Sequence, residues 1–120
     1  MKENVVVNKT FLFAIGIVKV YQKLTAEKKE FVLSKQLLRC GTSIGANVEE
    51  SEGGVSRKEF ISKFQIAYKE AKETKYWLRL LHSTNYIEEQ DFKILLSQID
   101  EILKIIVSIL KSTKKEPIIP

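Results

Sequence analysis

Apolar residues recur along this chain at spacings of three and four residues in four successive segments. This spacing matches the turn of an α-helix, so each segment predicts a helix with one apolar face. The predicted helices span about residues 8–24, 28–52, 57–82 and 88–112, followed by a tail over residues 113–120. The β-branched run at residues 5–7 is too short to compete as a strand.

Each predicted helix carries a line of residues that we expect to face a common core. The line in the first helix consists of Val7, Phe11, Ala14, Val18 and Tyr21. The line in the second consists of Leu33, Leu37, Cys40, Gly41, Ile44 and Val48. The line in the third consists of Phe60, Phe64, Ala67, Ala71, Thr74, Leu78 and Leu81, and that in the fourth of Phe92, Leu95, Leu96, Ile99, Leu103, Ile106 and Leu110. Further apolar residues widen the surface of the first helix, so we expect it to be covered on more than one side.

The breaks between the segments are short and carry recognisable end signals. Gly53 and Gly54 favour a helix end, because glycine adopts the left-handed backbone that often closes a helix. Ser56 followed by Glu59 has the spacing of a capping box, which predicts a helix start. Short connections favour antiparallel neighbours, so the chain is expected to form one all-α domain over residues 1–120, an antiparallel up-down-up-down four-helix bundle.

The segment from Arg39 to Gly54 combines small and polar residues within the second predicted helix. Its small residues, Gly41 and Gly45 among them, allow another helix to approach closely. Arg39, Ser43 and Asn47 recur every four residues and therefore share one face of the helix, with Glu50 near the same stripe.

Two motifs in the chain resemble those of a known family. The first reads R-x-x-x-S-I-x-x-N-x-x-E from Arg39 to Glu50, and the second reads E-T-x-Y-W-L-x-L-L from Glu73 to Leu81. Together they resemble the bacterial four-helix-bundle family of 23S rRNA intervening-sequence proteins. The chain departs from the family at Gly45, where alanine is common, and around Lys69–Lys72, where small residues and serine are more usual.

The resemblance implies an assembly rather than a reaction. Members of the family are expected to be homopentamers of four-helix bundles without an established enzymatic activity. One relative accompanies the reverse transcriptase of diversity-generating retroelements. The resemblance implies that this relative is a basic, pentameric partner of the enzyme that binds nucleic acid. A reverse-transcriptase-like or other protein partner is therefore one expectation for this chain.

The polar residues of the two motifs allow two interpretations, a ligand site or a structural network that holds helices in register. We favour the structural network, which would be buried and would comprise Arg39, Ser43, Asn47, Glu50, Glu73 and Tyr76. Trp77 falls off the apolar line of its helix and is a candidate interface residue, because aromatic side chains often anchor protein contacts. Packing of Trp77 within the monomer is the equal alternative.

The chain is basic, with a formal net charge of +5 and a pI of about 9.3. Residues 56–83 carry seven Lys or Arg against three Glu. The candidates for phosphate contacts are Lys19, Lys23, Lys58, Lys69, Lys72, Lys75 and Arg79. Cations clustered in this way can bind RNA or DNA through phosphates, and repetition in an oligomer would add weak contacts together. The alternative is a solvated basic face that only maintains solubility.

Catalytic and metal-binding chemistry is not indicated by the residue pattern. The single cysteine, Cys40, lies on an apolar line, so a buried and inert thiol is expected. The acidic group Glu49, Glu50 and Glu52 lacks the histidine partners of di-iron bundles, since His82 is the one histidine. No metal, cofactor or enzymatic activity is therefore expected. The apolar runs are too short or too interrupted for a membrane span, which predicts a cytoplasmic protein.

These features predict a non-enzymatic, oligomeric scaffold with a basic surface that binds RNA or DNA mainly through phosphates. The alternative is an adaptor between proteins that does not bind nucleic acid.

Overall fold

The computed structural model describes residues 2–115, with side chains placed for residues 5–113. The described chain consists of α1 (Lys2–Ala26), α2 (Leu33–Glu50), α3 (Arg57–Ser83) and α4 (Glu89–Lys115), and this part contains no strand. The prediction of an all-α protein with four helices is confirmed. The end of the predicted tail, with Pro117 and Pro120, lies outside the described residues.

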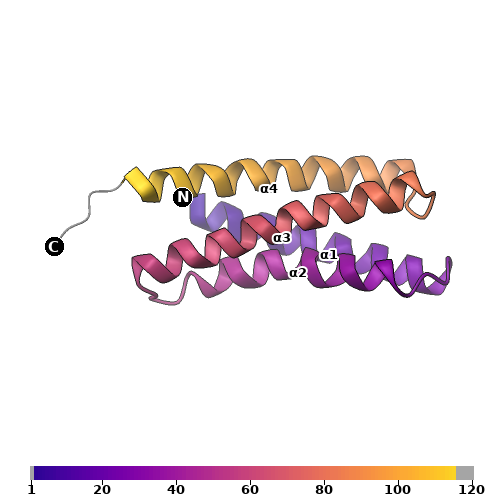
Figure 1. Cartoon of the computed structure of the whole chain (residues 1–120), viewed down its shortest axis with the longest axis horizontal. Coiled ribbons are helices and arrows are strands. Elements are labelled where there is room, and N and C mark those ends of the chain that lie inside the picture. Colours follow the sequence, from indigo (N-terminus) through magenta and orange to yellow (C-terminus); the bar gives the residue numbers. More distant parts are fainter. Residues whose placement is uncertain (1, 116–120) are drawn as a thin grey trace.

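The four helices lie side by side in an elongated body whose principal extents are 56 × 21 × 19 Å, and their connections lie at alternating ends of it (Figure 1). Helix α1 packs beside α2 and α4, and α3 packs beside the same two helices, whereas α1 and α3 lie diagonally across the bundle within the described chain. Because α1 and α3 occupy opposite corners, their outward faces look to opposite sides of the molecule.

The core runs along the centre of the bundle and includes apolar residues from all four helices. The predicted line of α3 is confirmed: Phe64, Ala67, Ala71, Thr74, Leu78 and Leu81 are buried, and Phe60 packs partly buried against them. The buried hydroxyl of Thr74 is satisfied within its own helix, because it donates a hydrogen bond of 2.7 Å to the carbonyl oxygen of Glu70.

The predicted core line of α1 is wrong by one residue. The buried residues are Val6, Phe13, Ile17, Val20 and Leu24, which repeat the predicted spacing one position away. From the predicted line, Phe11 and Val18 instead face solvent. Apolar residues occur almost all around this helix, so the spacing alone does not identify the face that packs inward.

The start of α2 also differs from the prediction. The helix begins at Leu33 rather than near residue 28, because Lys29 has a φ of 54° and interrupts the helical backbone. The carboxylate of Glu30 accepts hydrogen bonds from the backbone N–H groups of Ser34 (2.7 Å), Leu33 (3.2 Å) and Val32 (3.3 Å). These bonds satisfy donors that otherwise have no partner at a helix start.

The connection between α2 and α3 uses the residues that the sequence indicated. Gly54 has a φ of 71°, in the left-handed region that glycine tolerates. Ser56 caps α3, since its hydroxyl oxygen accepts a hydrogen bond of 3.1 Å from the backbone N–H of Glu59.

Within the described residues, the stretch Val5–Ala26 of α1 is long and apolar enough by length and composition to cross a membrane. This stretch has 22 residues and is longer than the sequence pattern indicated, since the apolar runs were expected to be too short or too interrupted for a membrane span. A core helix of a soluble protein meets the same criterion, and the finding is therefore weak evidence for a membrane span.

Candidate nucleic-acid interface

Ion pairs divide the seven candidate cations into two groups. Lys23 lies 3.1 Å from Asp91, and Lys75 lies 2.7 Å from Asp100, so α4 carboxylates neutralise both lysines. The hydrogen bond to Asp91 and the charge of that carboxylate raise the pKa of Lys23. Among the described residues, no carboxylate forms an ion pair with the remaining five, which are Lys19, Lys58, Lys69, Lys72 and Arg79.

Four of these unpaired cations lie on one line along the outer face of α3. We name this line the α3 stripe; it consists of Lys58, Ser62, Gln65, Lys69, Lys72, Tyr76 and Arg79. The members from Ser62 onward follow spacings of three and four residues, which place them on one side of a helix. Every member is exposed, and none is acidic. The α3 stripe is thus a solvated line of positive charge opposite the core.

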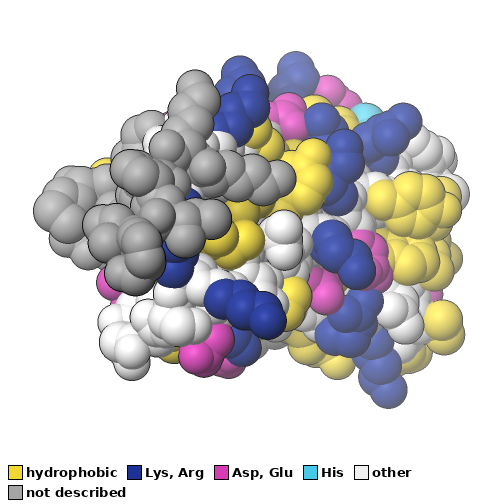
Figure 2. All heavy atoms as spheres, turned by 60° about the vertical axis from the view of Figure 1, so that its left-hand side comes forward, with side chains coloured by type: hydrophobic (Ala, Val, Ile, Leu, Met, Phe, Trp, Pro, Cys, Tyr) yellow, Lys and Arg dark blue, Asp and Glu magenta, His cyan; other side chains and the backbone are white. Residues whose placement is uncertain are grey.

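The acidic residues of α3 do not neutralise the stripe, because they are engaged elsewhere. Glu70 and Glu73 turn toward α2, where Arg39 pairs with them at 3.3 and 2.5 Å. Glu59 lies at the capped helix start beside Ser56. Figure 2 shows Lys and Arg side chains spread over one face of the molecule, with apolar and acidic side chains between them.

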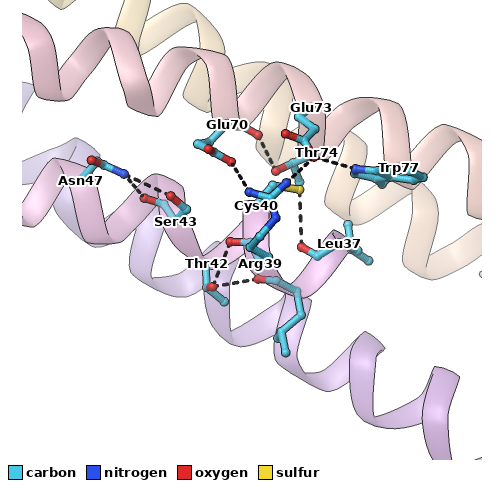
Figure 3. A network of polar contacts seen from close by, with 11 residues as sticks. Leu37, Arg39, Cys40, Thr42, Ser43, Asn47, Glu70, Glu73, Thr74 and Trp77 are labelled. Atoms are coloured by element: carbon cyan, nitrogen blue, oxygen red, sulfur yellow. Dashed lines mark hydrogen bonds and ion pairs between the residues drawn. The ribbon is translucent and has the colours of Figure 1, made fainter. Parts of the chain in front are cut away.

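Arg39 is the centre of a polar network between α2 and α3 (Figure 3). The indole N–H of Trp77 donates a hydrogen bond of 3.0 Å to the same Glu73 carboxylate. The Arg39 side chain is 52% exposed, so this network lies at the surface and is not buried as predicted. Exposed ion pairs stabilise only weakly, which makes a role in helix register more modest than expected.

The other predicted members of the network do not join it. Asn47 donates hydrogen bonds to the carbonyl and hydroxyl oxygens of Ser43 in its own helix, at 2.9 and 3.1 Å. Glu50 pairs with Lys63 at 2.6 Å. Tyr76 is 53% exposed, and its ring contacts Trp77 edge-on with centroids 5.1 Å apart. Of the six predicted residues, Arg39 and Glu73 therefore pair across the two helices, Ser43 and Asn47 bond to each other within α2, and Glu50 and Tyr76 contact other residues.

Trp77 has partners within its own chain. Its ring is partly buried against the hydrophobic core, and its indole nitrogen is bonded to Glu73. The more exposed member of the aromatic pair is Tyr76, which the sequence analysis had assigned to the polar network.

Lys19 and Lys23 belong to a different surface from the α3 stripe, contrary to the expectation that they would share one. Both line a groove of about 250 Å³ between α1 and α4, beside Leu12, Gly16 and Ile94. Since α1 and α3 lie diagonally across the bundle, the two sets of cations lie on separate sides of it.

One cation next to the stripe was missed by the sequence analysis. Lys104 of α4 shares a groove of about 300 Å³ with Lys72 and Tyr68 of α3, together with Leu103 and Val107. Lys104 is exposed and has no ion-pair partner among the described residues. Its place beside Lys72 follows from the register of α3 against α4, which the local sequence does not reveal.

The outer face of α1 forms a second distinctive surface. We name it the α1 apolar face; it consists of Phe11, Leu12, Ile15 and Val18, all of which are exposed. Ile94 of α4 is also exposed and lines the same groove as Leu12. Adjacent exposed apolar side chains of this kind are uncommon on monomeric proteins.

The candidates for metal and covalent chemistry are occupied by structural contacts. Cys40 is buried, and burial raises the pKa of its thiol to about 11. Nε2 of His82 lies 2.7 Å from Oε1 of Glu89, a hydrogen bond that lowers the pKa of the Glu89 carboxyl, and the His82 ring stacks on Phe92. Among the described residues, no three His, Cys, Asp or Glu side chains gather as a metal site.

Comparisons with known proteins agree with this architecture. The family model of 23S rRNA-intervening sequence proteins matches residues 2–108. The chain is also similar to the crystal structure of a protein with unknown function from the S23 ribosomal protein family of Bacteroides thetaiotaomicron VPI-5482. The two are 51% identical with a TM-score of 0.89, over 92% of this chain and 99% of the other. A comparison with curated proteins finds no match.

Proposed function

The chain belongs to the 23S rRNA-intervening sequence protein family, and from that premise we propose that it is a non-enzymatic, oligomeric scaffold that binds nucleic acid. The bound molecule is RNA or DNA, and its phosphates supply most of the contacts. The protein acts in the cytoplasm, with a nucleic-acid-processing protein such as a reverse transcriptase as a candidate partner.

The α3 stripe is the single observation that carries this proposal. Lys58, Lys69, Lys72 and Arg79 are exposed along one helix face, and no carboxylate among the described residues pairs with them. An unpaired cation gains more from a phosphate than one that already holds a carboxylate, because no existing ion pair has to break. Each phosphate contact also releases counterions from the nucleic acid, which favours binding at low salt.

The α1 apolar face supports the oligomeric part of the proposal. Its exposed side chains would be removed from water if copies of the chain associated there, and buried apolar area is the main driving force of such association. We propose an antiparallel up-down-up-down bundle, supported by the alternating connections in Figure 1, that assembles into a pentamer in keeping with the family resemblance. Because α1 and α3 lie at opposite corners, the α1 apolar face and the α3 stripe are separate surfaces of each copy, and a cyclic pentamer would pack the α1 apolar face against a different face of the next copy.

The proposal is tested by fluorescence anisotropy with labelled structured RNA, single-stranded DNA and duplex DNA over a series of salt concentrations. We expect affinity to fall steeply with salt, with a slope of about −0.7 to −0.9 per phosphate contact. A variant that replaces Lys58, Lys69, Lys72 and Arg79 with Gln should bind more weakly and with a shallower slope.

The matched control replaces four lysines away from the stripe, namely Lys28, Lys29, Lys35 and Lys93, with Gln. It loses the same charge, so equal weakening in both variants would indicate only a general effect of net charge and would contradict the assignment to the α3 stripe. Absence of binding at low salt would overturn the proposed function. Binding of a protein partner that survives high salt and depends on Trp77 would favour the adaptor instead.

A further inference from the structure

We propose that Tyr76 is a base-stacking residue and that the nucleic acid bound along the α3 stripe is single-stranded. This inference rests on the proposed function, because it names the class of ligand that the same surface takes. It assigns Tyr76 a role in binding in place of the structural role that its sequence motif suggested.

The exposure of Tyr76 has no explanation within the monomer. Its side chain is 53% exposed, and among the described residues no hydrogen-bond partner is found for its hydroxyl group. Its ring contact is the edge-on packing against Trp77, with an angle of 76° between the ring planes. An aromatic ring held by a neighbour and left in water is suited to receive another flat ring.

The neighbours of Tyr76 on the stripe provide phosphate contacts on both sides of it. Lys72 lies four residues before Tyr76 and Arg79 three residues after it, so about 5–6 Å separates the successive Cβ atoms. Both cations are exposed and lack a carboxylate partner among the described residues. A base stacked on Tyr76 would therefore place its adjoining phosphates within reach of positive charge in either direction along the helix.

The groove beside Lys72 extends the site toward α4. Tyr68, Lys72 and Lys104 line its polar side, and Leu103 and Val107 line its apolar side. A neighbouring nucleotide fits this mixture, with its phosphate near the two lysines and its sugar or base against the apolar wall.

The chemistry of stacking selects single strands over duplexes. In a duplex the faces of the bases are covered by their neighbours, whereas an unpaired strand exposes them to aromatic side chains. Proteins that bind single strands combine a basic track with aromatic platforms, and this is the combination that Tyr76 and its flanking cations form.

The aromatic pair also supplies an optical probe for the test. Trp77 is the one tryptophan of the chain, and its ring centroid lies 5.1 Å from that of Tyr76. A base that stacks on Tyr76 should therefore quench tryptophan fluorescence, whereas a duplex held only by its phosphates should alter it little.

The experiment measures binding of oligothymidylate and of a duplex of the same length to the full chain, by anisotropy and by Trp77 fluorescence at low salt. For Tyr76→Ala we expect a loss of about five- to hundredfold in affinity for oligothymidylate and unchanged affinity for the duplex. Tyr76→Phe keeps the ring and should retain binding. Phe31→Ala is the matched control, because Phe31 is equally exposed at 53% but lies in the connection between α1 and α2.

The outcomes separate this inference from the proposed function. Salt-dependent binding that is the same for Tyr76→Ala and the parent protein would overturn the stacking role and leave the phosphate-binding scaffold intact. Equal losses for oligothymidylate and duplex would also overturn it, and circular dichroism melting of each variant identifies a loss caused by unfolding. If Tyr76→Ala unfolds, Tyr76→Phe provides the test instead. A stacking role requires the Tyr76→Phe protein to bind oligothymidylate like the parent protein.

Discussion

Gly41 of α2 lies directly against the side chain of Ile17 of α1: a Cβ atom built at Gly41 would come within 2.9 Å of Cγ1 of Ile17. Ile17 is completely buried, and its branched Cβ leaves it few alternative rotamers. Gly41, a small residue within the first motif, therefore sets how closely α1 and α2 approach.

We expect Gly41→Ala to destabilise the protein, because the added methyl group overpacks the helix contact at a cost of about 1–3 kcal/mol. This cost should outweigh the gain of about 1 kcal/mol in helix propensity. Chemical denaturation measures the difference. Gly45→Ala is the control, since its methyl group would meet Thr10 at 3.3 Å, a milder contact. A Gly41→Ala protein as stable as the Gly45→Ala protein would contradict the close-contact explanation.

The cap of α2 predicts a dependence of stability on pH. Burial of Glu30 raises the pKa of its carboxyl, but the N–H groups of Ser34, Leu33 and Val32 lower it more, so the net pKa lies below its ordinary value of 4.5. A lowered folded-state pKa stabilises the fold above pH 4.5, and this contribution disappears as the pH falls through the folded-state pKa.

Glu30→Ala should therefore lower the free energy of unfolding at neutral pH by about 1 kcal/mol, the usual value of a lost cap. The difference from the parent protein should shrink as the solution is acidified below the ordinary carboxyl pKa. Urea denaturation at several pH values measures it, with Glu27→Ala as the exposed control. A difference that stays constant into acid would show that the ionised carboxylate does not cap α2.

The α1 apolar face predicts that self-association depends on a few outward side chains. Replacing Phe11 and Ile15 with Asp places charge on that face without entering the core, so the helices should remain folded while the assembly dissociates. Sedimentation velocity measures the change, and circular dichroism verifies the helices. Phe31→Asp changes an equally prominent apolar residue elsewhere and should leave the assembly intact. A parent protein that sediments as a monomer would refute the proposed assembly.

Burial of Cys40 predicts a thiol that does not react in the native protein. The thiolate is the reactive form, and a pKa of about 11 leaves little of it at neutral pH, besides the shielding by the core. A thiol reagent should label Cys40 at the rate of global or local opening and rapidly once denaturant unfolds the chain. Fast labelling under native conditions would contradict the buried placement.

Much of the candidate site was accessible to sequence reasoning, but its organisation was not. The stripe residues Lys58, Lys69, Lys72 and Arg79 were all selected from their spacing on one helix. Lys75 was selected with them, but in the structure it pairs with Asp100 of α4. The two residues become neighbours only when α3 and α4 pack together. The role of Tyr76 was obscured for a similar reason, since the motif does not tell which of its two aromatic residues turns toward the core.

The sequence by itself determined the number of helices, the core face of α3 and the cap at Ser56, because these depend on residues close together in one chain segment. Only the tertiary structure decided which apolar face of α1 packs inward. Two lines with identical spacing compete in that helix, and the choice depends on its partners, with Gly41 and Gly45 making room for Ile17 and Thr10. Tertiary packing likewise decided which lysines stay unpaired, because an ion pair forms only where a neighbouring helix brings a carboxylate close to the lysine.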